Sequence, residues 1–98
     1  MIAYEVTATV RQDLCDSYER YMREHHVDEV LATGAFAGAS FGRSSPGRYR
    51  IRYDAHDRAS LDRYLAEHAA RLRGAMARAF PAGVEYAREE WTELAAWP

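Results

Sequence analysis

Apolar and polar residues alternate through residues 1–10 of the chain, and this period of two predicts a half-buried β-strand. The same alternation returns in residues 48–54, where tyrosine or isoleucine follows each arginine. Residues 35–43 are rich in small side chains and predict another strand. Residues 44–47 have the serine, proline and glycine composition of a turn. We therefore expect the two later strands to form a hairpin.

Two other stretches repeat their apolar residues at the spacing of an α-helix. The first covers residues 14–26, follows Asp13 as N-cap, and can continue by a further turn until Gly34 ends it. Its expected buried side is Leu14, Tyr18, Tyr21, Met22 and His25. The second follows Asp57, and its expected buried side is Leu61, Tyr64, Leu65, His68, Leu72 and Met76. A break at residues 81–83 then precedes a last strand over residues 84–94.

The predicted order is β-α-β-β-α-β, which indicates an α+β protein of the ferredoxin-like class. In that class a four-stranded antiparallel sheet carries two helices on one face. With 98 residues the chain is expected to form a single domain, residues 1–98.

The second face of the predicted sheet has no helix to cover it. It carries a mixture of residues, namely Glu5, Thr7, Arg50, Arg52 and, by the same alternation, Glu89 and Trp91. A second copy can cover this face with its own, because a two-fold axis makes one patch self-complementary. We therefore expect a homodimer with facing sheets, a dimeric α/β barrel, in which Arg50 and Arg52 meet Glu5 or Glu89 either across neighbouring strands or across the two-fold axis.

Charge and composition narrow the range of partners. The net charge is −2, so there is no broad basic surface for nucleic acid. The apolar runs are far shorter than the roughly 18–20 residues that span a bilayer, and no signal segment precedes the first strand, so neither a membrane nor export is expected. The single cysteine, Cys15, fits a reducing compartment. These features indicate a cytoplasmic protein.

Three segments resemble a bacterial family known as domain of unknown function 4286. They are residues 1–7, residues 26–36, and residues 64–69 with Leu72, Arg73 and Phe80. The resemblance implies the dimeric α/β-barrel superfamily, which includes cofactor-free polyketide cyclases and small quinone-forming monooxygenases with a pocket between sheet and helices. It also implies that His26 and His68 are family features, whereas His25, Arg50 and Arg52 depart from the usual family pattern.

Two histidines are the candidate proton-transfer groups. The helical spacing predicts that His25 and His68 both face the sheet, where they can line one cleft, and imidazole titrates near neutral pH. The alternative interpretation is a buried neutral histidine that donates to a tyrosine hydroxyl or a backbone carbonyl.

Six tyrosines are expected in the same layer. Tyr4, Tyr49 and Tyr53 project from the sheet, and Tyr18, Tyr21 and Tyr64 project from the helices. Each buried hydroxyl needs a partner, whereas phenylalanine would fill the same volume without one. The tyrosines, with Met22 and His26, therefore predict a binding cavity for a planar aromatic or polyketide-like molecule. Alternatively, their hydroxyls reach the surface at the helix edges.

These residues favour a small cofactor-independent enzyme of the cyclase, isomerase or monooxygenase type, of the kind that acts in bacterial natural-product biosynthesis. His25 or His68 would remove a proton from an aromatic or enolisable metabolite, and Tyr53 or Tyr4 would stabilise the oxyanion by a hydrogen bond. No metal is expected, because His25 and Glu29 have no further ligand pair beside them, and no phosphate loop indicates a nucleotide. The alternatives are a non-catalytic small-molecule-binding homodimer and a purely structural dimer.

Overall fold

The computed structural model describes residues 1–98 and has the predicted β-α-β-β-α-β order. The first half contains β1 (Ile2–Val10), the 3₁₀ turn η1 (Gln12–Leu14), α1 (Cys15–Tyr21), the π-helical turn η2 (Met22–His26) and α2 (Val27–Leu31). The second half contains β2 (Phe36–Ser45), β3 (Arg48–Ala55), α3 (Arg58–Glu67), α4 (Ala69–Ala79) and β4 (Val84–Thr92). The last strand ends two residues earlier than the alternation predicts.

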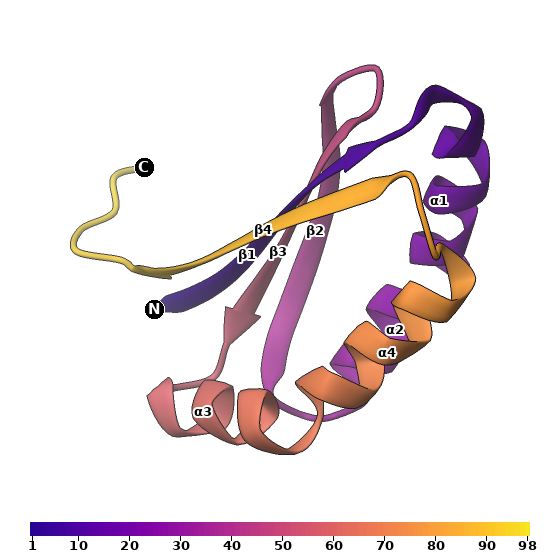
Figure 1. The fold of residues 1–98 in the computed structure, drawn as a ribbon. Coiled ribbons are helices and arrows are strands. Elements are labelled where there is room, and N and C mark those ends of the chain that lie inside the picture. Colours follow the sequence, from indigo (N-terminus) through magenta and orange to yellow (C-terminus); the bar gives the residue numbers. More distant parts are fainter.

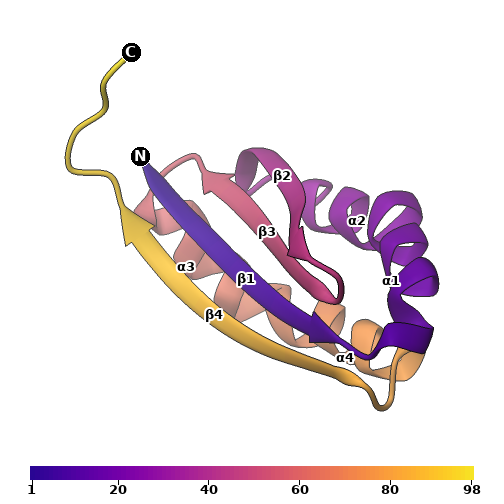
Figure 2. The same ribbon diagram turned by 90° about the horizontal axis from the view of Figure 1, so that it is seen from above.

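The four strands form one antiparallel sheet in the order β2-β3-β1-β4, so the ferredoxin-like fold and the predicted hairpin are confirmed. All helices lie on one face of this sheet, and the other face has no helical layer (Figures 1 and 2). β1 and β3 are central, with Tyr4 opposite Tyr53 and Val6 opposite Ile51. β4 is an edge strand, and beyond it the chain extends away from the domain.

The core lies between the sheet and the helices. Its largest fully buried side chains are Tyr18, Met22, Val30, Ile51, Tyr53, Leu61 and Leu72. Local signals position the elements around it: Asp57 caps α3 by accepting a hydrogen bond from the Ser60 backbone N–H at 2.7 Å. Gly47 supplies the positive φ of the β2–β3 turn, at 81°. No helix is both long and apolar enough to cross a membrane.

The π-helical turn η2 changes which histidine faces the core. The Val27 N–H bonds to the Met22 carbonyl, five residues back, so this turn holds one residue more than an α-helical turn. The inward positions therefore run Tyr18, Met22, His26 and Val30, while His25 is exposed. The expectation that His25 faces the sheet is wrong, because it assumed an uninterrupted 3.6-residue repeat.

The uncovered face of the sheet is crossed by polar contacts. Arg50 Nε lies 3.6 Å from Glu5 Oε1, and Trp91 Nε1 donates a hydrogen bond to Glu5 Oε2 at 3.2 Å. The expected pairing of Arg50 with Glu5 is confirmed. Arg52 instead pairs with Asp54 of its own strand, at 3.2 Å, because both side chains point to the same face two residues apart.

Candidate functional site

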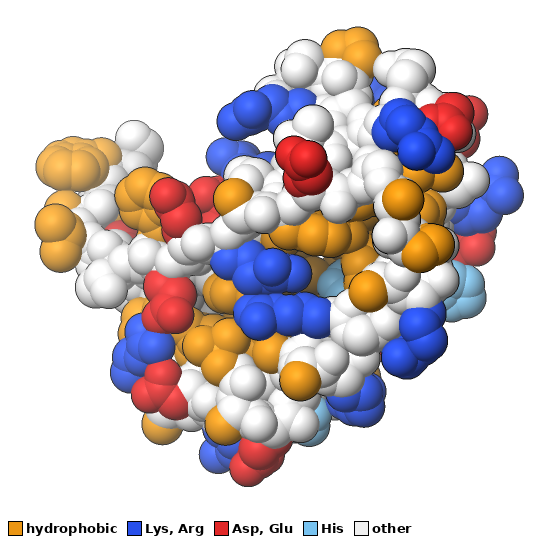
Figure 3. Space-filling model, in the orientation of Figure 1, with side chains coloured by type: hydrophobic (Ala, Val, Ile, Leu, Met, Phe, Trp, Pro, Cys, Tyr) orange, Lys and Arg blue, Asp and Glu red, His pale blue; other side chains and the backbone are white.

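A cavity of about 30 Å³ lies between the sheet and the helices. Its walls come from β1, β3, β4, α1, η2, α3 and α4, and consist of Tyr4, Val6, Tyr18, Met22, His26, Ile51, Tyr53, Tyr64, Leu72, Arg73, Met76, Tyr86 and Arg88. Figure 3 shows an apolar recess on this side of the molecule, with basic side chains across it. The space suffices for one or two water molecules, so a larger ligand requires the side chains at its mouth to move.

The buried polar atoms without a hydrogen-bond partner gather around this cavity. They are the hydroxyls of Tyr18, Tyr53 and Tyr86 and the Nδ1 atom of His26, and all four residues line its wall. Tyr18 is fully buried, and Tyr53 is 2% exposed. A buried hydroxyl without a partner costs about 1–3 kcal/mol. These four atoms therefore belong to residues that line one cavity, and they have no hydrogen-bond partner within the protein.

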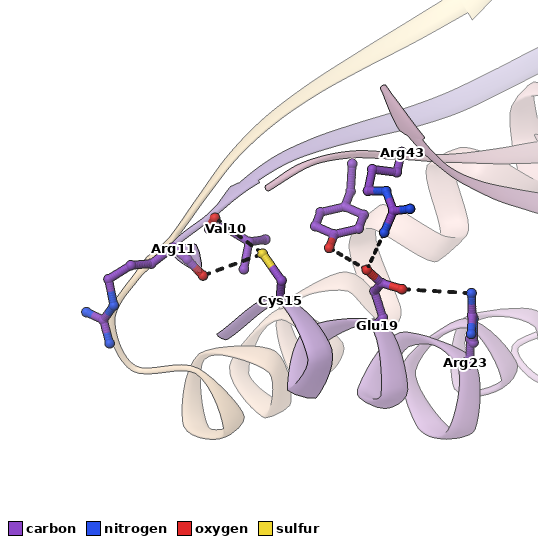
Figure 4. Close-up of polar contacts among 7 residues, drawn as sticks. Val10, Arg11, Cys15, Glu19, Arg23 and Arg43 are labelled. Atoms are coloured by element: carbon purple, nitrogen blue, oxygen red, sulfur yellow. Dashed lines mark hydrogen bonds and ion pairs between the residues drawn. The ribbon is translucent and has the colours of Figure 1, made fainter. Parts of the chain in front are cut away.

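Two other buried tyrosines, Tyr49 and Tyr4, have hydrogen-bond partners in the protein. The Tyr49 hydroxyl donates to Glu19 Oε2 at 2.7 Å, and Arg43 Nη1 binds the same oxygen at 3.0 Å. These two contacts link Glu19 of α1 to the β2–β3 hairpin (Figure 4). Glu19 also lies 3.9 Å from Arg23, one turn further along the helix. The Tyr4 hydroxyl accepts a hydrogen bond from Arg73 Nη2 at 2.8 Å. Among the cavity-lining tyrosines, Tyr4 is thus already partnered.

Burial sets the protonation states inside the cavity. Desolvation raises the pKa of Tyr18 and Tyr53 far above the ordinary tyrosine value, and it raises the pKa of Tyr64 and Tyr86 to about 12. These phenols therefore keep their protons at neutral pH and can act as hydrogen-bond donors.

The His26 imidazole is the complementary group. Burial lowers its pKa, the nearby Arg88 adds to this effect, and Glu29 opposes it. The ring is therefore neutral at pH 7 and, with its proton on Nε2, can accept a hydrogen bond or a proton at Nδ1. One neutral base and several phenolic donors thus share one poorly hydrated space.

Five of the seven residues predicted to contact a ligand line the cavity, as does Tyr53. The five are Tyr4, Tyr18, Met22, His26 and Tyr64. Tyr49 is turned toward Glu19 instead, and Tyr21 lies outside the wall, against His26 and Phe80 with ring centroids 6.3 and 5.5 Å apart. The six tyrosines therefore do not converge on one point.

Neither predicted catalytic histidine lines the cavity. His25 is exposed for the reason given above. His68 interrupts the helix between α3 and α4, with φ −123° and ψ −33°, so the regular spacing that predicted an inward ring does not continue through it. Its Nδ1 lies 3.2 Å from Arg71 Nη2, and its ring lies beside Tyr64. The imidazole that lines the cavity is His26.

Four wall residues other than core aliphatics had no predicted ligand role. Tyr86 and Arg88 lie on the helix-facing side of β4, and Arg73 and Met76 lie on α4. Extending the two-residue alternation through the last strand places Tyr86 and Arg88 on one face, so the signal was present. No cluster of three or more histidine, cysteine, aspartate or glutamate side chains has the arrangement to hold a metal ion.

The fold and the cavity define a small ferredoxin-like α+β protein with a buried, phenol-lined chamber between its sheet and its helices. The chain belongs to the family described as a domain of unknown function, DUF4286, which matches residues 1–94. No curated protein is similar enough in sequence to be recognised as a relative.

Several solved structures have the same fold. SnoaB, a cofactor-independent oxygenase from Streptomyces nogalater, superposes with a TM-score of 0.74 at 16% identity, over 99% of this chain and 96% of its own. HapK from Hahella chejuensis superposes with a TM-score of 0.73 at 14% identity, over 100% and 97% of the two chains. A dimeric ferredoxin-like protein from an uncultured marine organism gives 0.64 at 13% identity, over 98% and 96%. At these identities the likeness establishes the fold alone.

Proposed function

We propose that this protein is a small cofactor-independent enzyme that removes a proton from a planar aromatic or enolisable metabolite in the cavity. Monooxygenation is the reaction we favour. The observation that carries the proposal is the set of four unpartnered polar atoms around one space, three phenolic donors and one neutral imidazole. The likeness to SnoaB, a cofactor-independent oxygenase, supports the choice of reaction class.

In this mechanism His26 is the base. Its Nδ1 takes a proton from an acidic CH₂ group or a phenol of the substrate, which becomes an enolate or phenolate. Tyr53 and Tyr18 donate hydrogen bonds to the new oxyanion, and such donors act strongly because burial reduces competition from water. Neither His25 nor His68 fits this role, because neither lines the cavity.

The oxygenation step needs only dioxygen as co-reactant. The deprotonated carbon adds to O₂, the O–O bond of the resulting peroxide breaks, and a substrate CH₂ becomes C=O. The second oxygen atom leaves as water. The substrate supplies all of the electrons. His26 returns the first proton to the peroxide and then takes the remaining C–H proton as the O–O bond breaks, and that proton leaves with the second oxygen atom in the water molecule. A ring can reach His26 only if the exposed Arg73 and Arg88 side chains move outward.

We further propose that two copies pair through the uncovered sheet face, in the cytoplasm. Glu5, Arg50 and Trp91 form a polar and apolar patch there that a second copy can match across a two-fold axis. One structure of the same fold is described as dimeric. Trp91 is 53% exposed, and burial of its ring in a dimer would remove an apolar surface from water.

The test is aerobic turnover of anthrone, a neutral tricyclic molecule whose acidic CH₂ can become a quinone carbonyl. Oxygen uptake and quinone absorbance are measured for the wild type, His26→Gln, Tyr53→Phe and His25→Gln. We expect His26→Gln to lose about 10²-fold or more in turnover and Tyr53→Phe to lose at least about tenfold. His25→Gln should retain turnover, because that side chain is exposed.

Equal turnover by wild type and His26→Gln would refute the proposed base. If anthrone binds and is recovered unchanged, the protein is instead a small-molecule-binding protein that uses the same cavity.

A further inference from the structure

The mouth of the cavity is formed by two arginines from different parts of the chain. Arg73 lies on α4 and Arg88 on β4, and together they are the permanently charged residues of the cavity wall. Both also line an open groove outside, together with Tyr4, Leu65, Glu89 and Glu90. Arg73 and Arg88 are therefore common to the wall of the inner chamber and the wall of the outer groove.

Neither arginine is neutralised by a carboxylate. Arg73 forms its hydrogen bond with the Tyr4 hydroxyl, and the Arg88 guanidinium carbon lies 5.2 Å from the centre of the Tyr86 ring. Neither takes part in a salt bridge. Glu90, which lines the same groove and lies two residues after Arg88 on β4, is paired with Arg58 at 2.6 Å. Other arginines are also unpaired at the surface, but these two face a chamber with unpartnered polar atoms.

The wall supplies hydrogen-bond donors almost exclusively. It contains no aspartate or glutamate. Tyr18, Tyr53 and Tyr86 present hydroxyl donors, the arginines present N–H donors, and His26 Nδ1 is the one unpartnered imidazole atom. A ligand that satisfies such a wall must be rich in acceptors, and a negative charge at the mouth would compensate two guanidinium groups.

We infer that the ligand is an aromatic carboxylate whose acid group binds Arg73 and Arg88 at the mouth while its ring enters the chamber. This inference rests on the proposed function for the location of the site, and it adds the charge of the ligand. A carboxylate matches the fork of N–H donors on a guanidinium group, so both arginines can bind one acid group. Glu89, which lines the outer groove, disfavours a ligand with a second acid group there.

The test compares two probes of nearly the same shape, 3-hydroxy-2-naphthoate and its neutral amide, titrated by fluorescence against the full chain. We expect the wild type to bind the acid at least about tenfold more tightly than the amide. Arg73→Gln and Arg88→Gln should each weaken acid binding about tenfold and leave amide binding nearly unchanged. Arg78→Gln removes the same charge from an exposed position of α4 outside the wall, and it should have no such effect.

Equal affinity for acid and amide in the wild type would overturn the inference, as would an equal loss in Arg78→Gln and Arg73→Gln. No acid binding up to about 1 mM would overturn it too. Tyr53→Phe locates the probe, because binding inside the chamber should weaken for both acid and amide. Turnover of the neutral substrate anthrone tests the proposed function separately. Either result, enzymatic activity or preference for a charged ligand, can therefore fail without the other.

Discussion

The unpartnered hydroxyls predict an unusual result, in which removal of a buried polar atom stabilises the protein. Tyr53 is 2% exposed, and its hydroxyl has no hydrogen-bond partner. Such a group costs about 1–3 kcal/mol in the folded state. Tyr53→Phe removes that cost but also removes some packing, so we expect a net gain of about 1 kcal/mol in the free energy of unfolding without ligand. For a domain of this size that gain raises Tm by about 4–8 °C.

Tyr49→Phe is the matched control. It removes the same atom from a tyrosine that is 3% exposed, but here the hydroxyl donates to the Glu19 carboxylate at 2.7 Å. Loss of a hydrogen bond to a charged group costs about 1–2 kcal/mol when the partner stays in contact with water. We therefore expect Tyr49→Phe to be less stable than the wild type by about that amount.

Urea unfolding at one fixed protein concentration measures both variants, since the proposed dimer would make stability depend on concentration. We expect the two substitutions to change the free energy of unfolding in opposite directions. If Tyr53→Phe is destabilised as much as Tyr49→Phe, the Tyr53 hydroxyl has a partner in the free protein. That result would refute the assignment of the unpartnered atoms to a ligand site.

Three further outcomes are expected. Burial lowers the pKa of His26 below the ordinary 6.5, so the unfolded chain takes up the proton first. The contribution of His26 to the free energy of unfolding is complete above about pH 6.5 and declines as the pH falls toward the folded-state pKa. The urea midpoint of His26→Gln should therefore lack this decline with pH, and the midpoint of His25→Gln should keep it. Gly47→Ala should lose about 1–3 kcal/mol by thermal unfolding, because its φ is 81° and a Cβ would lie 2.7 Å from the Val10 carbonyl oxygen. Leu61→Ala, in a fully buried position, should lower the urea midpoint by the equivalent of about 2–5 kcal/mol, and an unchanged midpoint would contradict the described core.

Prediction from the sequence succeeded where a pattern depends on residues close together in the chain. The alternation in β1 and β3 placed Tyr4, Ile51 and Tyr53 on the helix-facing side, and the structure buries all three. Asp57 acts as the expected helix cap. In each case the side-chain direction follows from the backbone geometry of a few neighbouring residues, which a period of two or 3.6 captures.

The histidines of the site were harder to predict, because the backbone departs from a regular helical repeat at two points. One extra residue in the turn Met22–His26 brought His26 inward and turned His25 to solvent. The break at His68 similarly ended a helical repeat that was assumed to continue. Both departures are local in the backbone, but the spacing of apolar residues does not indicate them.

By itself, then, the sequence determined the order of the elements, the faces of the strands and the concentration of tyrosine between sheet and helices, since these follow from local periodicity. Only the tertiary structure decided which hydroxyls have partners. Glu19 of α1 reaches Tyr49 across the layer but not Tyr53, and Arg73 and Arg88 meet at one cavity because α4 packs beside β4 and β1. A hydrogen bond between residues 30 positions apart, such as Tyr49 and Glu19, depends on how the sheet and helices pack, and no local pattern in the sequence specifies it.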